Sequence, residues 1–320
     1  MAINIKKIFE IERKPRKGLL AVEWAILAYM VFTLVLMLIT YTKLQNPESM
    51  LWGRARFLII TFALWGVYRM IPCRFTLFCR IGAQLALLSW WYPDTYEFNR
   101  MFRNLDHVFA GYEQQLFHCQ PALLFSQKIS NPVFSELMHL GYATYYPLIA
   151  LVSLFYFLYR YQEFQRATFI ILTSFFIYYV VFILLPVTGP QYYYLAAGLD
   201  NIANGSFPSV GDYFATHDES LPIPGWKDGF FYQCVASAHA AGERPTAAFP
   251  SSHVGVTTIL LLLAWHARNR KLVYTILPFF VLMCLATVYI QAHYAVDVIG
   301  GWISAVVIYA VLLFFSKKFV

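Results

Sequence analysis

Charged residues are scarce in this chain. Asp, Glu, Lys and Arg make up only 13% of its 320 residues, whereas hydrophobic residues make up 59%. A soluble globular chain has about 25% charged residues, so this composition excludes that class. Strands of a membrane barrel are excluded as well, because the apolar runs are longer and more continuous than the alternating segments of about ten residues that build barrels. The sequence therefore predicts an all-α integral membrane protein.

Acidic residues are fewer than basic ones, 17 against 24, which gives a net charge of +7. An excess of this kind can serve nucleic-acid binding. Here, however, the basic residues lie in short segments between apolar runs, where they set the orientation of membrane helices. We expect no nucleic-acid partner.

Apolar runs of about 18 residues or more, the length that crosses a bilayer, recur along the chain. They predict eight transmembrane helices, at residues 19–42, 51–71, 73–92, 131–157, 164–187, 251–267, 272–290 and 292–316. The first run follows a basic stretch and is longer than the core of a signal peptide. We therefore expect it to remain as a membrane anchor.

With eight spans, all the basic segments fall on one face of the membrane. They contain Lys6, Lys7, Arg13, Lys14, Arg16, Lys17, Arg69, Arg74, Arg160, Arg166, Arg268, Arg270, Lys271, Lys317 and Lys318. The positive-inside rule assigns this face, and with it both termini, to the cytoplasm. Two long loops, 93–130 and 188–250, then lie on the opposite face. Loops of this length usually carry function, and we expect short interfacial helices within them.

Cysteine is rare, with five residues, and none stands at a spacing typical of a metal site. Cys119 and Cys234 fall in the two outer loops, where an oxidising compartment would permit a disulfide between them. The alternative is a pair of free thiols that pack as small hydrophobic side chains.

A histidine and a carboxylate, His293 and Asp297, stand four residues apart at the outer edge of the last predicted span. On a helix this spacing brings both side chains to one face. A carboxylate that accepts a hydrogen bond from one imidazole nitrogen fixes the tautomer and makes the other nitrogen a better nucleophile. The pair is therefore a candidate nucleophile with its orienting partner, and a hydrogen-bonded interfacial pair is the alternative.

A second histidine, His253, follows Pro250, Ser251 and Ser252 at the start of another predicted span, on the same face. The serines suit the cap of a helix, whose free N–H groups and dipole favour an anion. This makes Ser251 and Ser252 candidates for phosphate binding, and it makes His253 a candidate general acid. A capped helix with a satisfied histidine is the alternative.

A third stretch, residues 186–192, lies where the fifth predicted span reaches the outer face. It ends with Gln191 and Tyr192, which we consider candidates for substrate binding. Alone, the stretch is typical of a helix end rich in turn residues. Its position on the same face as the two histidine segments makes a common site more plausible than three separate helix ends.

Taken in sequence order, residues 186–192, 250–253 and 293–297 resemble the first, second and third motifs of the phosphatidic acid phosphatase type 2 superfamily. This superfamily includes lipid phosphate phosphatases and phosphotransferases of the sphingolipid-synthase type. The Pro-Ser-x-His and His-x-x-x-Asp patterns at residues 250–253 and 293–297 carry the resemblance. It implies a core of six helices at 73–316, preceded by a basic segment and two extra helices at 1–72 and followed by a cytoplasmic tail at 317–320. It also implies that His293 is the nucleophile, that Asp297 orients it, and that His253 is the acid.

Two departures from the phosphatase pattern concern positive charge. Gln191 stands where that pattern has an arginine, and Ala286-Thr287 stands where it has a Ser-Arg pair. Such cations hold a phosphate monoester, which is close to doubly charged at neutral pH, whereas a phosphodiester carries one negative charge. The segment from Thr287 through Gln291 to Asp297 resembles instead the inositol phosphorylceramide synthase branch, which also lacks that arginine. Thr287 and Gln291 therefore join the candidates for substrate binding.

Arg244 lies nine residues before His253 and is a candidate to supply the missing charge, although a solvated loop arginine is the alternative. Tyr192 and its two neighbouring tyrosines could line a headgroup cavity or anchor the chain at the interface.

The sequence thus predicts a membrane lipid phosphotransferase. It would move a phosphoryl headgroup of the inositol-phosphate type from a phospholipid donor to a lipid hydroxyl such as that of ceramide, through a phosphohistidine, with no metal or cofactor. A lipid phosphate phosphatase with the same residues and a catalytically silent membrane scaffold are the alternatives. We expect the extracytoplasmic face of a bacterial inner membrane as its location, and the sequence leaves the oligomeric state open.

Overall fold

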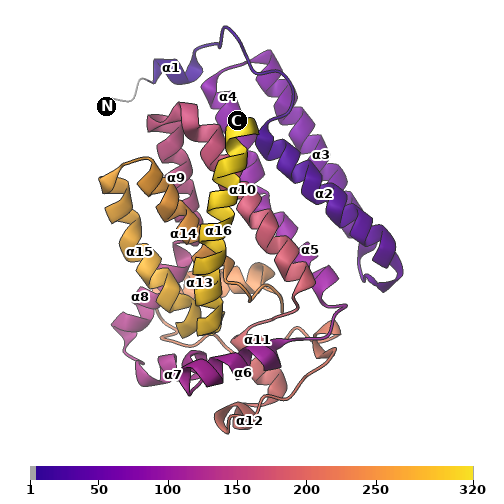
Figure 1. Ribbon diagram of the computed structural model, residues 1–320, viewed down its shortest axis with the longest axis vertical. Coiled ribbons are helices and arrows are strands. Elements are labelled where there is room, and N and C mark those ends of the chain that lie inside the picture. The colour runs from indigo at the N-terminus through magenta and orange to yellow at the C-terminus, as the bar shows by residue number, and fades with distance from the viewer. Residues whose placement is uncertain (1–4, 320) are drawn as a thin grey trace.

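The computed structural model describes residues 5–319, with side chains up to residue 317. Every regular element in this range is a helix (Figure 1). Most of the predicted cytoplasmic tail at 317–320 therefore lies outside the described side chains.

Five helices are long and apolar enough to cross a membrane. They are α2 (Ala21–Thr40), α3 (Pro47–Met70), α10 (Tyr161–Leu184), α15 (Arg270–Tyr289) and α16 (Ala295–Phe319). Each coincides with one of the predicted spans to within a few residues. The prediction of an all-α integral membrane protein is confirmed.

The predicted span at 131–157 is instead a bent pair, α8 (Pro132–Ala143) and α9 (Tyr145–Tyr159), whose axes differ by 48°. Pro147 explains the bend. It has no N–H group to donate to the carbonyl of Ala143, and its ring crowds that carbonyl. The helix must therefore break between the two halves.

The two remaining predicted spans, 73–92 and 251–267, correspond to shorter helices. The first is α4 (Arg74–Ala86) followed by α5 (Leu88–Asn99), and the second is α14 (Ser252–His266). By length and composition the described chain holds five spans, or six with the bent pair. The count of eight stays a prediction.

Helix α10 lies at the centre of the bundle, and 72% of its apolar segment is buried. It packs against α2 and α5 on one side and against α9, α14 and α16 on the other (Figure 1). This arrangement joins the N-terminal hairpin of α2 and α3 to the helices that carry the histidine segments.

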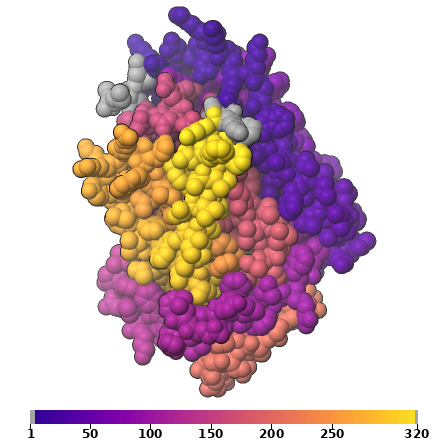
Figure 2. Space-filling view, in the orientation of Figure 1, coloured from indigo at the N-terminus to yellow at the C-terminus, as the bar shows by residue number. Residues whose placement is uncertain are grey.

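Short helices gather at the end of the bundle opposite to α1 (Lys6–Phe9), and α6 and α7 lie across this end beneath α16 (Figures 1 and 2). They come from the two predicted outer loops. They are α6 (Asp106–Phe117), α7 (Pro121–Lys128), α11 (Pro190–Ala197), α12 (Leu199–Ala203) and α13 (Phe230–Gly242), together with a 3-10 turn at Tyr213–Ala215. A second 3-10 turn, at Tyr41–Lys43, connects α2 to α3 and belongs to neither outer loop. Short helices are therefore present in the predicted outer loops, and their interfacial position stays a prediction.

A fully buried ion pair joins the N-terminal hairpin to α4. Glu23 of α2 and Arg80 of α4 have no exposed side-chain surface and bind through two hydrogen bonds. Arg80 also donates to the carbonyl of Gly18 at 3.1 Å. A buried ion pair of this kind is costly to break, because the remaining charge has no partner in a medium of low dielectric.

We therefore expect Glu23→Gln or Arg80→Met alone to destabilise the protein by about 3–5 kcal/mol. The double variant should recover much of this loss, because neither charge is then left unpaired. Thermal unfolding in detergent measures the effect. Single variants that unfold at the temperature of the parent protein would contradict the role of the pair.

Candidate active site

The structure brings the two predicted catalytic histidines together. His293 lies in the turn between α15 and α16, and His253 lies in the first turn of α14. The Nε2 atom of His293 is 3.5 Å from the Nδ1 atom of His253. The ring of His253 stacks on Tyr142 with centroids 4.6 Å apart, and it lies 4.3 Å from the ring of Tyr145.

A backbone carbonyl sets the tautomer of His293. Its Nδ1 atom is 2.8 Å from the carbonyl oxygen of Ala248. Because a carbonyl oxygen only accepts, Nδ1 carries the proton and the lone pair of Nε2 faces His253. Burial lowers the pKa of His293 to about 4, although the Ala248 carbonyl and the Glu243 carboxylate act in the opposite direction. The imidazole is therefore neutral and nucleophilic at pH 7.

Asp297 does not make the orienting hydrogen bond that the sequence predicts. Its Oδ2 atom is 3.6 Å from Nδ1 of His293, longer than a hydrogen bond. The same oxygen accepts a hydrogen bond of 2.8 Å from the backbone N–H of Tyr294. Asp297 therefore closes the first turn of α16 beside the ring, and Ala248 supplies the orienting contact.

The N-terminus of α14 offers free donors next to His253. Ser251 caps this helix, and its side-chain oxygen accepts a hydrogen bond of 3.4 Å from the backbone N–H of Val254. Within residues 5–319, the backbone N–H groups of Ser252 and His253 have no acceptor. Together with the helix dipole, these two groups suit phosphoryl oxygens.

The N-terminus of α16, by contrast, is already occupied. Glu113 of α6 accepts hydrogen bonds from the backbone N–H groups of Ala295 and Val296, at 3.0 and 2.9 Å. Burial raises the pKa of Glu113 to about 7, although these two hydrogen bonds act in the opposite direction. Of the two helix N-termini beside the histidines, only that of α14 keeps free N–H groups for a ligand.

A second carboxylate of α6, Asp106, holds the first-motif stretch. It accepts hydrogen bonds from the backbone N–H groups of Thr188 and Gly189, at 2.7 and 2.8 Å, and from the hydroxyl of Tyr294 at 3.1 Å. Burial raises the pKa of Asp106 even though its hydrogen bonds act in the opposite direction. Sequence reasoning missed both carboxylates. The available signal was their spacing of seven residues, which places them on one face of a helix.

A cavity of about 530 Å³ opens onto both histidines. Six tyrosines dominate its wall: Tyr92, Tyr142, Tyr145, Tyr146, Tyr179 and Tyr192. Neither lysine nor arginine lines it in the described chain, and its single carboxylate belongs to Glu243. The hydroxyl of Tyr92 donates a hydrogen bond of 2.8 Å to Glu243. Burial raises the pKa of Glu243, although Tyr92 and His293 act in the opposite direction.

The candidates for substrate binding divide into two groups. Gln191, Tyr192 and Ser252 line the cavity together with the histidines. Ser251 is fully buried behind it as the helix cap. The side chain of Gln191 donates a hydrogen bond of 2.6 Å to the carbonyl of Leu221, so one of its donors is already used.

Thr287 and Gln291 act through their backbones. The hydroxyl of Thr287 donates to the carbonyl of Cys284 at 3.2 Å, and its own carbonyl accepts from the backbone N–H of His293 at 3.0 Å. Gln291 has a φ of 64° in the turn before His293, and its carbonyl accepts from the backbone N–H of Gln191 at 3.0 Å. Neither side chain lines the cavity.

Arg244 is not brought to the cavity. Its guanidinium is 46% exposed and pairs with Asp218 at 3.3 Å, in a neighbouring pocket. The predicted disulfide is not formed either, since Cys119 and Cys234 are both free thiols. Cys119 follows α6, whereas Cys234 is exposed on α13, which packs against α8.

A comparison with protein-family models identifies the family of the chain. The family described as the PAP2 superfamily matches residues 107–311. The chain belongs to the PAP2 superfamily. This membership indicates an enzyme of the lipid phosphatase or phosphotransferase type. No curated protein and no solved structure matches the chain.

The PAP2 match covers all three motif stretches, the second outer loop and residues 107–130 of the first, and it leaves the α2–α3 hairpin outside. Among the described residues, no three His, Cys, Asp or Glu side chains gather as a set of metal ligands. The structure places His253 and His293 together beside the free N-terminus of α14, and a third histidine, His239, lines the same cavity.

The raised pKa of Glu113 predicts how stability depends on pH. The pKa of this carboxyl is about 7 in the folded protein, against an ordinary value of 4.5. Folding therefore favours the protonated form, so its contribution is complete below about pH 4.5 and is lost as the pH rises through about 7. We expect the melting temperature of the parent protein to fall between pH 5 and 8 relative to that of Glu113→Gln, measured in detergent.

Glu219→Gln, at an exposed acid, is the matched control and should follow the parent protein at each pH. A difference between parent and Glu113→Gln that does not change with pH would contradict the assignment.

Proposed function

We propose that this PAP2-superfamily protein is a lipid phosphotransferase of the inositol phosphorylceramide synthase-like branch. It transfers a phosphoryl headgroup from a phosphodiester lipid, such as phosphatidylinositol, to a lipid hydroxyl such as that of ceramide. The observation that carries the proposal is the charge of the cavity, whose described walls hold Glu243 but neither lysine nor arginine.

The charge of the cavity favours a diester donor. A phosphate monoester brings nearly two negative charges, and the cations that normally offset them are missing from the walls. Glu243 would add repulsion when ionised. A diester brings one negative charge, which the N–H groups of Ser252 and His253 and the dipole of α14 can hold.

The proposed first step is attack by Nε2 of His293 on phosphorus. A nitrogen–phosphorus bond forms as the bond to the diacylglycerol oxygen breaks, and His253 gives a proton to that oxygen. In the second step, the acceptor hydroxyl attacks the phosphohistidine, gives its proton to His253 and releases Nε2 of His293.

Substrate binding must move the rings of His253 and His293 apart. Their facing nitrogens are 3.5 Å apart. Reacting atoms approach to about 3–3.5 Å before bond formation, and a general acid needs about 2.6–3.2 Å to its own oxygen. A phosphorus atom in line between the nucleophile and the leaving oxygen therefore requires a larger separation of the rings.

We also propose eight membrane spans with both termini in the cytoplasm and the site on the extracytoplasmic face of a bacterial inner membrane. The catalytic core is 73–316, and 1–72 adds the N-terminal hairpin. Support comes from the basic residues along the predicted cytoplasmic segments. The α15–α16 turn, which carries His293, lies at the end of the bundle opposite to α1, which fits this orientation (Figure 1).

The test is an assay of the purified protein in liposomes with a labelled phosphodiester donor, with and without a ceramide-type acceptor. We expect transfer that depends on the acceptor and little inorganic phosphate from monoesters. His253→Ala should lower the rate by about 10²–10⁴-fold, the usual contribution of general acid–base catalysis. His293→Ala should abolish transfer, because the nucleophile is lost.

The exposed His217 provides the control, and His217→Ala should keep the rate of the parent protein. Efficient release of phosphate from lipid monoesters, independent of the acceptor, would favour a phosphatase instead. Transfer that survives in His293→Ala would contradict both the transferase and the phosphatase, because each needs this nucleophile.

A further inference from the structure

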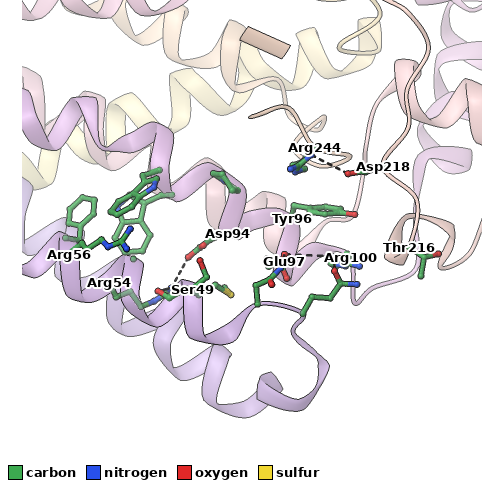
Figure 3. A pocket seen from close by; sticks show the side chains of 18 residues that line it. Ser49, Arg54, Arg56, Asp94, Tyr96, Glu97, Arg100, Thr216, Asp218 and Arg244 are labelled. Carbon is green, nitrogen blue, oxygen red and sulfur yellow. Dashed lines mark hydrogen bonds and ion pairs between the residues drawn. The ribbon is translucent and has the colours of Figure 1, made fainter. Parts of the chain in front are cut away.

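Figure 3 shows a second pocket, of about 690 Å³. It is formed by the first turns of α3 with the two residues before them, by α5 with Arg100, and by Thr216, Asp218 and Arg244 of the outer loop. The two pockets share Trp90 and Pro93 in their walls. Because α3 lies outside the region of the family match, this pocket is built in part by the added N-terminal hairpin.

Arg54 is the central residue of this pocket, and it is only 5% exposed. Its Nη1 atom binds Asp94 at 2.9 Å and the carbonyl of Met50 at 2.8 Å, and its guanidinium carbon lies 5.5 Å from the centre of the Trp91 ring. Its Nε and Nη2 atoms are buried and have no hydrogen-bond partner within the described residues. Buried guanidinium donors of this kind normally bind an acceptor.

Three further arginines line the same pocket, namely Arg56, Arg100 and Arg244 (Figure 3). With Arg54 they make four cations, against the three carboxylates Asp94, Glu97 and Asp218, so the lining carries one positive charge in excess. The planar guanidinium group matches the oxygens of a phosphate better than an ammonium group does. The catalytic cavity, with no arginine or lysine in its described lining, has the opposite character.

The other wall of the pocket is apolar. Met50, Phe57, Trp90 and Trp91 contribute to it. On the neighbouring outward surface of α3, Trp52 and Ile59 are each 66% exposed. Since α3 is long and apolar enough to cross a membrane, these side chains suit contact with acyl chains.

We propose that this pocket is a second, non-catalytic binding site for the phosphate headgroup of a membrane phospholipid. The arginines hold the phosphate, and the acyl chains lie along the outward face of α3. The shared wall at Trp90 and Pro93 places the bound lipid next to the catalytic cavity, so the site can hold donor lipid or retain product.

The test uses the full chain in detergent, with His293→Ala as background so that no probe is turned over. The probe is a short-chain, radiolabelled phosphatidylglycerol, and binding is measured by equilibrium dialysis. Arg54→Lys keeps a charge for Asp94 but removes the free Nε and Nη2 donors, and Arg56→Gln removes an exposed charge.

We expect each single variant to weaken lipid binding at this site about tenfold. The double variant Arg54→Lys with Arg56→Gln should bind one lipid fewer per chain.

Lys227→Gln is the matched control, since it removes one exposed positive charge outside the pocket. It should leave binding unchanged, and thermal unfolding should show that all variants are folded. If Lys227→Gln weakens binding as much as Arg56→Gln does, the attraction is general and the site is refuted. Unchanged binding in both arginine variants also refutes it.

Inorganic phosphate is the second probe. If it binds as tightly as the short-chain lipid and is lost in the same variants, the pocket holds soluble anions and the lipid assignment is wrong. Because the measurement is of binding in a background without the nucleophile, failure of this proposal is distinct from failure of the proposed transfer reaction.

Discussion

Two buried carboxylates of one short helix hold the candidate catalytic segments in place. Asp106 binds the backbone of the first-motif stretch at Thr188 and Gly189, and Glu113 binds the first turn of α16 beside His293. Burying carboxyl groups is costly unless hydrogen bonds compensate, and Asp106 accepts five and Glu113 two. Helix α6 therefore joins segments more than a hundred residues apart in the sequence, and the geometry of the histidines depends on it.

The sequence predicted the five long apolar helices to within a few residues, because long apolar runs indicate membrane spans. It also predicted that His253 and His293 meet, because topology places both at one end of the bundle. It could not predict that Ala248 orients His293, since a backbone carbonyl leaves no mark in the sequence. Asp297 has the expected spacing, but its Oδ2 atom accepts from the backbone N–H of Tyr294 and lies too far from His293 for a hydrogen bond. The bend at Pro147 interrupts a continuous apolar run, so hydropathy alone predicts one straight span there.

Positive charge is distributed unevenly between the two neighbouring pockets. The cavity at the histidines relies on the N–H groups and dipole of α14, which can hold one negative charge, whereas the pocket at Arg54 concentrates guanidinium groups. The sequence suggested Arg244 as a replacement cation for the cavity at the histidines. In the structure it lies in the other pocket, where it pairs with Asp218. We therefore assign chemistry and lipid retention to different pockets that share one wall.

In the proposed reaction, Nε2 of His293 forms the covalent intermediate. The decisive measurement is quenching of the protein without acid after mixing with donor lipid labelled at phosphorus, followed by peptide mapping of the label. We predict a phosphohistidine at His293, attached through Nε2, because Nδ1 is bound to the carbonyl of Ala248. Label on Nδ1 of His293, on His253, or on no histidine while transfer proceeds would contradict the claim.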